Sequence, residues 1–577
     1  MNTRILKRQT NETLKNDIWR ACDILRRDNN VGGIIEYTEH LAWLLFLKFL
    51  DEEEKNRVAE GVVTGEPYEP VLLNTELAWD NWASPEKLSQ WDADELIRFV
   101  RGTLLPGLAS LSGSPLARTI AGIFSDESLG DQTVVRNVPV CASGYNLKEV
   151  LEIINSIRFD SDEDIFTITQ VYEDLLERMG AENRISGEFH TPRPIIRFMV
   201  QVIAPQVGET VYDPAYGSAG FLAEAYEFMK RLPEAQSAEA YAILQHETFF
   251  GNEKKGIAAL LGTMNMVLHG VTTPNLQRAN TLEESMKGSV SPRYDIILTN
   301  PPFGGTEGRH IQNNFPVKSN ATELLFLQHI IKKLKKTPNA RAAVVVPEGT
   351  LFRGGAFAEV KKDLLDQFHL YMVVSLPPGA FAPYSDVKTA LLFFQRPDAV
   401  LQANPLARNE TLYYELPLPE GLKKFSKGSP IQDEHFQEIR EYWRRWRAWL
   451  RGEDERPFDF AADIRDRWRV HYVWEAWRKD EKGKVEKPRP AADDSPAARD
   501  AHAAEGPRPE PPYNVWVETL ADLQARGYDL SARNPNQDDR QTLPHPAELT
   551  ASLLERVREM QNILENLHEM VSNGEDV

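Results

Sequence analysis

The chain has little cysteine, no long apolar run and no excess of positive charge. Its 577 residues include only two cysteines, Cys22 and Cys141. Neither belongs to a CxxC pair, so we expect neither a zinc cluster nor a disulfide framework, and no other metal site. No apolar run reaches the roughly 18 residues that a membrane-spanning helix needs, and residues 1–9 lack the apolar segment of a signal peptide. The sequence therefore predicts a cytoplasmic protein without membrane contact.

The formal net charge of −20 at pH 7 limits what the chain can bind by itself. Lysine and arginine that neutralise phosphates supply most of the non-specific affinity of proteins for nucleic acid. A chain of this charge that acts on nucleic acid needs a local basic surface or a partner that grips the substrate. Otherwise its substrate belongs to another class.

Composition and apolar spacing divide the chain into five regions. Residues 1–155 show helical spacing and predict an N-terminal helical domain. Residues 156–400 alternate strands with helices, which predicts an α/β fold with a mostly parallel, Rossmann-like sheet. Residues 401–478 predict a strand-poor helical extension, and residues 479–512, rich in proline, alanine and charge, a disordered linker or insertion. Residues 513–577 form a C-terminal region.

Six short apolar runs are the candidate strands of the sheet. They lie at Val211, Thr248–Phe250, Asp295–Thr299, Ala343–Val346, Met372–Leu376 and Ala390–Phe394.

Two groups of aromatic residues could either pack in a core or stack on bases. Trp79, Trp82 and Trp91 lie in the N-terminal region, where burial is the favoured interpretation. In residues 441–449, arginine alternates with tryptophan, a pattern that also occurs in proteins that bind single-stranded nucleic acid. Helical spacing places Tyr442, Trp446 and Trp449 on one face, so we favour an amphipathic helix packed on the core.

The C-terminal region carries a heptad pattern. Apolar residues repeat with 4,3 spacing at Leu553, Val557, Met560, Leu564, Leu567 and Val571. Such a seam needs another helix to cover it. That surface belongs either to the chain's own core or to a partner, and the pattern leaves both open.

The tetrapeptide Asn300-Pro301-Pro302-Phe303 is the strongest chemical signal. It follows a candidate strand, and two prolines remove two N–H donors, so a stiff turn must follow the strand. Open α/β sheets bind their ligands at the carboxyl ends of strands. The Asn300 amide oxygen and the Pro301 carbonyl can accept hydrogen bonds from an amine, and Phe303 can stack on a ring. The turn suits a planar NH2-bearing group, although a purely structural turn would explain it too.

A second motif makes a binding site the better explanation. The segment Asp213 to Gly220, with sequence DPAYGSAG, reads as the end of a strand, a glycine-rich turn and the start of a helix. Such a turn lets the backbone approach a ligand closely. It is neither a P-loop nor GxGxxG. Glu253 ends the next candidate strand, where an acid can bind the two hydroxyls of a ribose.

In this order, the motifs resemble those of the modification subunit of type I restriction-modification systems, an amino-group DNA methyltransferase that uses S-adenosylmethionine. The resemblance extends from about Trp19 to Asn536. It includes the segment Ser186 to Arg193, with sequence SGEFHTPR, which in the family closes over the cofactor, and the C-terminal signature around Gly527 to Ser531. The chain departs from the family at Tyr216, commonly Cys; at Ala219, commonly Gly; and at Asn280, often Asp.

The resemblance implies a role for each matching residue. Asn300, Pro301, Pro302 and Phe303 would be catalytic. The cofactor would be bound by Glu188, Phe189, His190, Thr191, Pro192, Arg193, Asp213, Pro214, Ala215, Gly217, Ser218, Ala219, Gly220, Glu253 and Asn280. We expect transfer of the S-adenosylmethionine methyl group to adenine N6 of double-stranded DNA, with the adenine flipped out of the duplex.

The resemblance also implies partners. They are a specificity subunit that reads the DNA sequence, a restriction (helicase-nuclease) subunit, and a second modification subunit on the same specificity subunit. Two alternatives stay open at this point: N-methylation of a protein glutamine amide, whose enzymes carry a related Asn-Pro-Pro turn, and a catalytically silent scaffold.

Overall fold

The computed structural model describes nine stretches of the chain, within two compact units. The described residues are 11–64, 68–125, 138–157, 191–271, 273–382, 385–419, 421–453, 514–531 and 534. One unit consists of Met1–Pro490 and Val517–Ala532, and the other of Ala491–Trp516 and Arg533–Val577. The linker predicted at 479–512, the heptad helix and the segment Glu188 to His190 lie outside the described residues.

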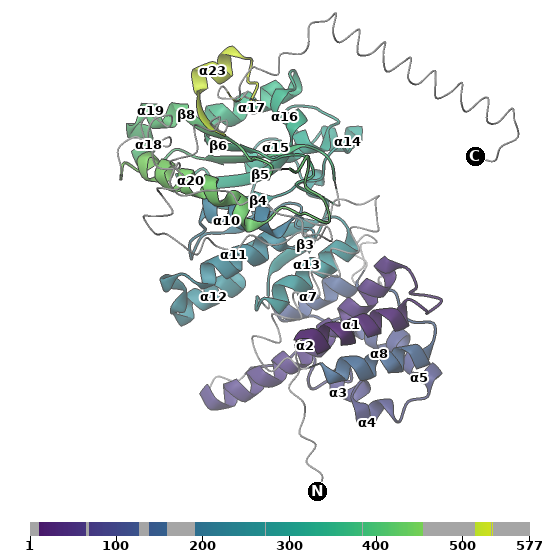
Figure 1. The fold of residues 1–577 in the computed structure, drawn as a ribbon. Helices are drawn as coiled ribbons and strands as arrows, with labels where there is room; N and C mark the ends of the chain where they lie inside the picture. The colour runs from purple at the N-terminus through teal and green to yellow at the C-terminus, as the bar shows by residue number, and fades with distance from the viewer. Residues whose placement is uncertain are drawn as a thin grey trace, which may run out of the picture. The chain divides into compact units, whose positions relative to one another are not determined.

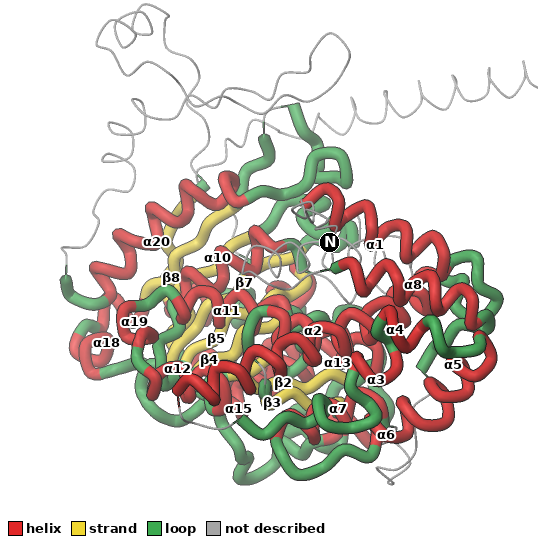
Figure 2. Tube along the Cα trace, turned by 90° about the horizontal axis from the view of Figure 1, so that it is seen from below, coloured by secondary structure: helices red, strands yellow, loops and turns green. Residues whose placement is uncertain are grey.

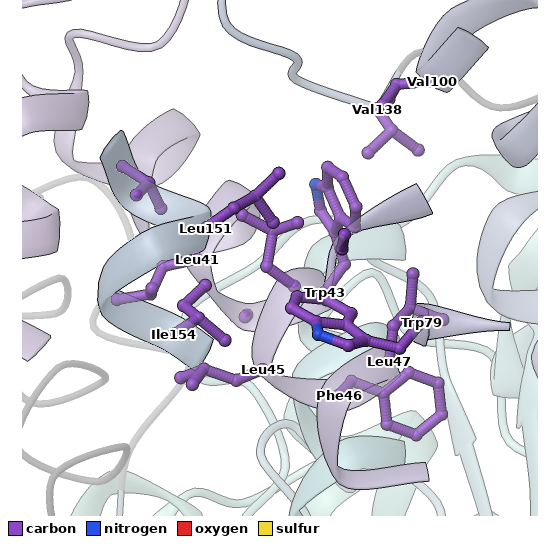
Figure 3. Packing of buried hydrophobic residues seen from close by; sticks show 14 of the residues in the cluster. Leu41, Trp43, Leu45, Phe46, Leu47, Trp79, Val100, Val138, Leu151 and Ile154 are labelled. Carbon is purple, nitrogen blue, oxygen red and sulfur yellow. The ribbon is translucent and has the colours of Figure 1, made fainter. Parts of the chain in front are cut away.

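The N-terminal region is helical, as its spacing predicts. Its apolar residues form one core, in which Trp43, Trp79 and Trp82 are at most 2% exposed. Figure 3 shows Trp43 and Trp79 among the leucine side chains of this core. The helices are α1 (Asn11–Leu25), α2 (Ile34–Thr64), α3 (Trp79–Trp82), α4 (Pro85–Leu88), α5 (Ala93–Phe99), α6 (Leu105–Ala109), α7 (Pro115–Phe124) and α8 (Gly144–Ser156), with a π-helical turn η1 (Val100–Leu104).

Nine strands form one sheet in the order β3-β2-β1-β4-β5-β7-β6-β8-β9. Strand β7 is antiparallel to β5 and β6, whereas β2 is parallel to β3 and β1, β4 to β1 and β5, and β6 to β8. The α/β class and the mostly parallel sheet are therefore confirmed (Figure 1). The strands are β1 (Val211–Asp213), β2 (Phe249–Glu253), β3 (Asn275–Arg278), β4 (Ile296–Thr299), β5 (Arg341–Pro347), β6 (His369–Ser375), β7 (Thr389–Gln395), β8 (Glu410–Glu415) and β9 (Val515–Thr519).

Helices cover both faces of the sheet. The connection from β1 to β2 and the connection from β4 to β5 run in opposite directions across the sheet, so right-handed crossovers place their helices on opposite faces. Among them, α10, α11 and α13 pack on one another, and α15 packs on α17. Figure 2 shows the yellow strands between red helices. These helices are α10 (Arg193–Ile203), α11 (Gly220–Lys230), α12 (Ala238–His246), α13 (Gly256–Leu268), α14 (Arg309–Gln312), α15 (Thr322–Lys333), α16 (Glu348–Phe352), α17 (Ala356–Gln367), α18 (Ala399–Ala403), α19 (Pro405–Asn409), α20 (Gln437–Leu450) and α23 (Leu520–Ala525).

The sheet is larger than the six predicted strands. All six are present, but β3, β8 and β9 were not expected. Strand β8 pairs in parallel with β6. The predicted domain boundary at residue 400 therefore falls inside the sheet. Strand β3 has an exposed and partly buried pattern without a continuous apolar run, so hydrophobicity does not reveal it.

The aromatic residues pack rather than face solvent. Trp79 and Trp82 are buried, and Trp91 packs against the same core. In α20, Tyr442, Trp446 and Trp449 are buried, whereas Arg444 is exposed, so the amphipathic interpretation is confirmed. Within the described residues, no helix is both long enough and apolar enough to cross a membrane.

Candidate active site

The ends of three neighbouring strands bring the motifs of the sequence together. Strands β2, β1 and β4 are adjacent and parallel, so their carboxyl ends lie at one edge of the sheet. Asp213 ends β1, Glu253 ends β2, and Asn300 directly follows β4. The glycine-rich turn, the acid and the tetrapeptide, which are distant in sequence, therefore share one edge.

The glycine-rich turn leads from β1 into α11. The Asp213 carboxylate accepts the N–H of Ala215 at 3.0 Å. Burial raises the pKa of Asp213 to about 7, although hydrogen bonds from Thr299 and Ala215 act in the opposite direction. Gly217 and Ala219 both have positive φ, at 52° and 58°, and α11 begins at Gly220. The free N–H groups of the α11 N-terminus therefore face the same edge as Asn300.

The Glu253 carboxylate joins the ends of two strands. One oxygen accepts the N–H of Gly217 at 3.1 Å, and the other accepts the N–H of Lys255 at 2.8 Å. The side chain is only partly buried. Each carboxylate oxygen can accept more than one hydrogen bond, so Glu253 can hold the turn and still accept from two ribose hydroxyls.

Tyr216, where the family commonly has Cys, is accommodated by two glycines. Its ring is 4% exposed. A Cβ at Gly251 would lie 2.7 Å from the ring, and one at Gly262 would lie 2.8 Å from it. Burial raises the pKa of Tyr216, so the hydroxyl stays protonated. The large side chain therefore fills space that the two glycines leave free.

Three side chains brace the turn from the elements around it. The Thr281 hydroxyl donates to the carbonyl of Pro214 at 2.5 Å, and the Asn265 amide of α13 donates to the carbonyl of Ser218 at 2.7 Å. The Arg193 guanidinium donates to the carbonyl of Gly220 at 3.2 Å. Sequence reasoning gave no role to Thr281 or Asn265, because neither belongs to a catalytic or binding pattern by itself.

Asn280 already has partners within its own turn. Its oxygen accepts the N–H of Leu282 at 3.3 Å, and its amide nitrogen donates to Glu283 at 3.0 Å. It therefore serves as the N-cap of the short helix at Thr281–Glu283. The predicted role in cofactor binding would have to use the second lone pair of its oxygen.

Asn300 presents its amide oxygen to the site. Its amide nitrogen donates to the hydroxyl of Thr191 at 2.9 Å. Its oxygen is buried and has no hydrogen-bond partner among the described residues. A buried acceptor without a partner costs free energy, which an incoming N–H group would recover. Pro301 is buried, and Phe303 is half-buried.

The predicted cofactor-closing segment divides into two parts. Glu188, Phe189 and His190 lie outside the described residues. The structure places Thr191 against Asn300, and Arg193 against the start of α11, with Pro192 as the N-cap of α10. The described part of the segment therefore contacts both the Asn-Pro-Pro-Phe tetrapeptide and the glycine-rich turn.

Comparison with known proteins identifies the family. The family model described as N-6 DNA Methylase matches residues 161–478, and the HsdM N-terminal domain matches residues 14–154. The chain belongs to the methylase subunits of type I restriction enzymes. It is 36% identical to the EcoEI methylase subunit of Escherichia coli over 425 residues, which cover 73% of this chain and 81% of that protein. This methylase subunit is thus an enzyme, a DNA methyltransferase specific for adenine N6.

Two further similarities agree with this assignment. The EcoKI methylase subunit of Escherichia coli K12 is 31% identical over 443 residues, which cover 74% of this chain and 75% of that protein. One solved structure concerns the complex assembly and conformational transition of the type I restriction-modification system. A chain of that structure is 51% identical to this one and superimposes with a TM-score of 0.69. That match covers 98% of this chain and all of the other. The glutamine-methylating and scaffold alternatives have no support from these relatives.

Replacing Ala219 by glycine should stabilise the methylase subunit. Ala219 has a φ of 58°, a left-handed conformation that costs a residue with a Cβ roughly 1 kcal/mol and costs glycine little. We expect Ala219→Gly to raise the free energy of unfolding by up to about 1 kcal/mol. Ala223→Gly, in the regular part of α11, is the matched control and should lower it by about 1 kcal/mol. Thermal and denaturant unfolding would measure the free energy of unfolding of both variants. Destabilisation by Ala219→Gly would show that Ala219 is not strained.

Replacing Thr191 should reduce turnover more than cofactor affinity. In Thr191→Val the Asn300 amide loses its acceptor and can rotate, which places N–H groups where the oxygen should meet the amine. We expect kcat to fall by about 10- to 100-fold, the equivalent of one buried hydrogen bond. Thr191→Ser keeps the hydroxyl and should retain most of the activity. Methylation kinetics and calorimetric titration with S-adenosylmethionine would separate the effects, and a loss confined to cofactor affinity would favour a cofactor contact instead.

Proposed function

We propose that this enzyme uses S-adenosylmethionine and that the residues at the carboxyl edge of β1, β2 and β4 divide the work between cofactor and adenine. The backbone from Asp213 to Gly220 binds the methionine part, and Glu253 binds the ribose. Asn280 lies beside the expected adenine of the cofactor. S-adenosylmethionine supplies an activated methyl group.

The observation that carries the proposal is the unpartnered amide oxygen of Asn300. With one N–H of its nitrogen bound to Thr191, the Asn300 amide keeps its oxygen available to a ligand. That oxygen and the Pro301 carbonyl accept the two N–H bonds of the adenine N6 amine, which raises electron density on the nitrogen. Phe303 stacks on the base. Alignment of the amine supplies much of the rate, and no strong base is required before transfer because the proton leaves from a cationic nitrogen.

The target adenine must leave the duplex to reach this turn, at an unstacking cost of a few kcal/mol. We propose that partners provide much of the binding energy for this step, because the chain carries a net charge of −20. A specificity subunit would hold and read the DNA, and two modification subunits would bind to it. A restriction subunit would complete the restriction-modification complex.

Asn300→Ala is the direct test of the chemistry. It should reduce methyl transfer below detection because the amine loses its acceptor, while the dissociation constant for S-adenosylmethionine stays within about twofold. Phe303→Ala should keep cofactor affinity and lose about 1–3 kcal/mol of base stacking. Methyl incorporation and calorimetry on the same preparations would measure both. An Asn300→Ala enzyme with substantial activity would remove the assignment.

The isolated subunit should bind DNA weakly and without sequence preference. Addition of the cognate specificity subunit should make binding tight and sequence-dependent, with a steep dependence on salt concentration. The heptad segment Leu553–Val571 is our candidate for part of this contact, so a chain ending at residue 545 should still bind cofactor but assemble poorly. Mass photometry and DNA titration would measure this, and unchanged assembly of the shortened chain would show that the seam packs elsewhere.

A further inference from the structure

An aromatic side chain is exposed at the end of the short helix that follows the strand beside the catalytic turn. Helix α16 follows β5, which pairs in parallel with β4, with Thr299 opposite Val344. It therefore leaves the sheet at the same edge as Asn300. Its last residue, Phe352, is 56% exposed.

A buried lysine fixes the backbone on both sides of Phe352. Lys361 of α17 is 1% exposed, and its amine donates to the carbonyl of Leu351 and, at 3.0 Å, to the carbonyl of Arg353. Burial lowers the pKa of Lys361 to about 8. Burying an amine is costly unless its hydrogen bonds are made. Here the hydrogen bonds hold the two residues that flank the exposed ring.

The C-terminal signature provides a second support. The N–H of Leu530 donates to the same Leu351 carbonyl at 3.0 Å, and the Tyr413 hydroxyl donates to the Leu530 carbonyl at 3.2 Å. Figure 1 shows α16 and α17 close to α23, the helix that leads into this signature. The sequence resemblance identified this signature but assigned it no structural role. In the structure, it stabilises the end of α16.

A third support connects Phe352 with the catalytic turn. The Arg353 guanidinium donates to the Glu323 carboxylate at 3.2 Å, and the other Glu323 oxygen accepts the N–H of Gly304 at 3.4 Å. Gly304 directly follows Phe303. The position of the exposed ring is thus coupled, through one carboxylate, to the turn that holds the target base.

The backbone turns away immediately after Arg353. Among the described residues, Gly354 has no neighbour within 4 Å of where a Cβ would lie, and Gly355 has φ 61° and ψ −129°, a conformation that residues with a Cβ avoid. As the chain leaves this edge of the sheet, Gly354 and Gly355 therefore place no side chain against the Phe352 ring.

The charges around α16 do not explain the exposed ring. Arg353 pairs with Glu323, and Lys388 pairs with Glu348 at 2.8 Å. The cations beside Phe352 are therefore balanced by acids and offer little net charge to a phosphate. Single exposed apolar residues are common on protein surfaces. Phe352 differs because three separate interactions hold the residues on either side of it, and one of them reaches the catalytic turn.

We propose that Phe352 stacks within the DNA duplex at the position that the target adenine leaves. This inference rests on the proposed function. Extrusion of a base exposes the faces of its neighbours, and proteins that distort DNA use apolar side chains to fill such gaps. Because the residues on either side of Phe352 are fixed by hydrogen bonds, little backbone freedom is lost when the ring binds. Phe352 would thus stabilise the flipped state, while Phe303 stacks on the extruded base.

The test compares two duplexes in the complex with the cognate specificity subunit. One duplex carries the methylation site of the wild-type complex, with thymine opposite the target adenine. This site is located by mapping the adenines that the wild-type complex methylates. The other has an abasic position opposite the target, which makes extrusion easier. Phe352→Ala should lower kcat/KM by about 10- to 100-fold on the paired duplex, the scale of one aromatic stacking contact. On the abasic duplex, kcat/KM of Phe352→Ala should stay within about threefold of the wild-type value. The free-energy cost of extruding the adenine is smaller there, so Phe352 has less to offset.

Two variants serve as controls. Phe352→Trp keeps an aromatic ring and should behave like wild type on both duplexes. Leu406→Ala removes an apolar residue that is 50% exposed on α19 and should change neither rate. Calorimetry should show unchanged S-adenosylmethionine affinity for Phe352→Ala, which shows that the site is folded.

Two results would overturn the inference. One is a Phe352→Ala enzyme with wild-type kcat/KM on the paired duplex, and the other is an equal loss on both duplexes. A wild-type complex that methylates no adenine when its sites are mapped is a separate outcome, which would remove the proposed function and this inference with it.

Discussion

The site depends on the hydrogen bond between the Glu253 carboxylate and the N–H of Gly217. This bond joins the turn after β1 to the end of β2 and holds both strand ends where a cofactor can lie across them. Within the turn, the Asp213 carboxylate accepts the N–H of Ala215, whereas its glycines and alanines offer no polar side chains. Braces from α10, α13 and the segment after β3 supply what the turn lacks. Residues proposed to bind the cofactor and residues that hold the backbone are therefore partly the same.

Polar groups at this edge are placed at a cost to stability. The Asn300 oxygen is buried without a partner among the described residues, and Asp213 is buried with its pKa raised to about 7. As pH rises from about 4 through 7, the stabilisation that comes from a neutral buried Asp213 is lost, because its carboxyl must then ionise in a buried position. Lys361 is buried too, but its hydrogen bonds to two carbonyls compensate. Such costs are typical of sites arranged to meet a ligand.

The departures from the family motif have different physical outcomes. Tyr216 replaces a smaller residue, and Gly251 and Gly262 provide the room that its ring needs. The strain at Ala219 lies in its left-handed backbone conformation, and neighbouring residues do not compensate for it. One substitution is thus absorbed by neighbouring residues, whereas the other leaves strain at the start of α11.

The sequence alone determined the α/β class, the six central strands and the order of the motifs, because buried strands are continuous apolar runs and the Asn-Pro-Pro-Phe turn follows one of them directly. It also determined the packing of Trp446 and Trp449, since helical spacing separates them from the arginines. Strand β3 escaped detection because it is not apolar, and β8 because a short strand in a helical stretch carries little signal. Tertiary structure alone showed that Thr191 contacts Asn300 across 109 positions of the chain. It alone showed that Lys361 and Leu530 hold the residues on either side of Phe352. Side-chain contacts between distant segments depend on how the chain folds back on itself, and spacing along the sequence does not encode them.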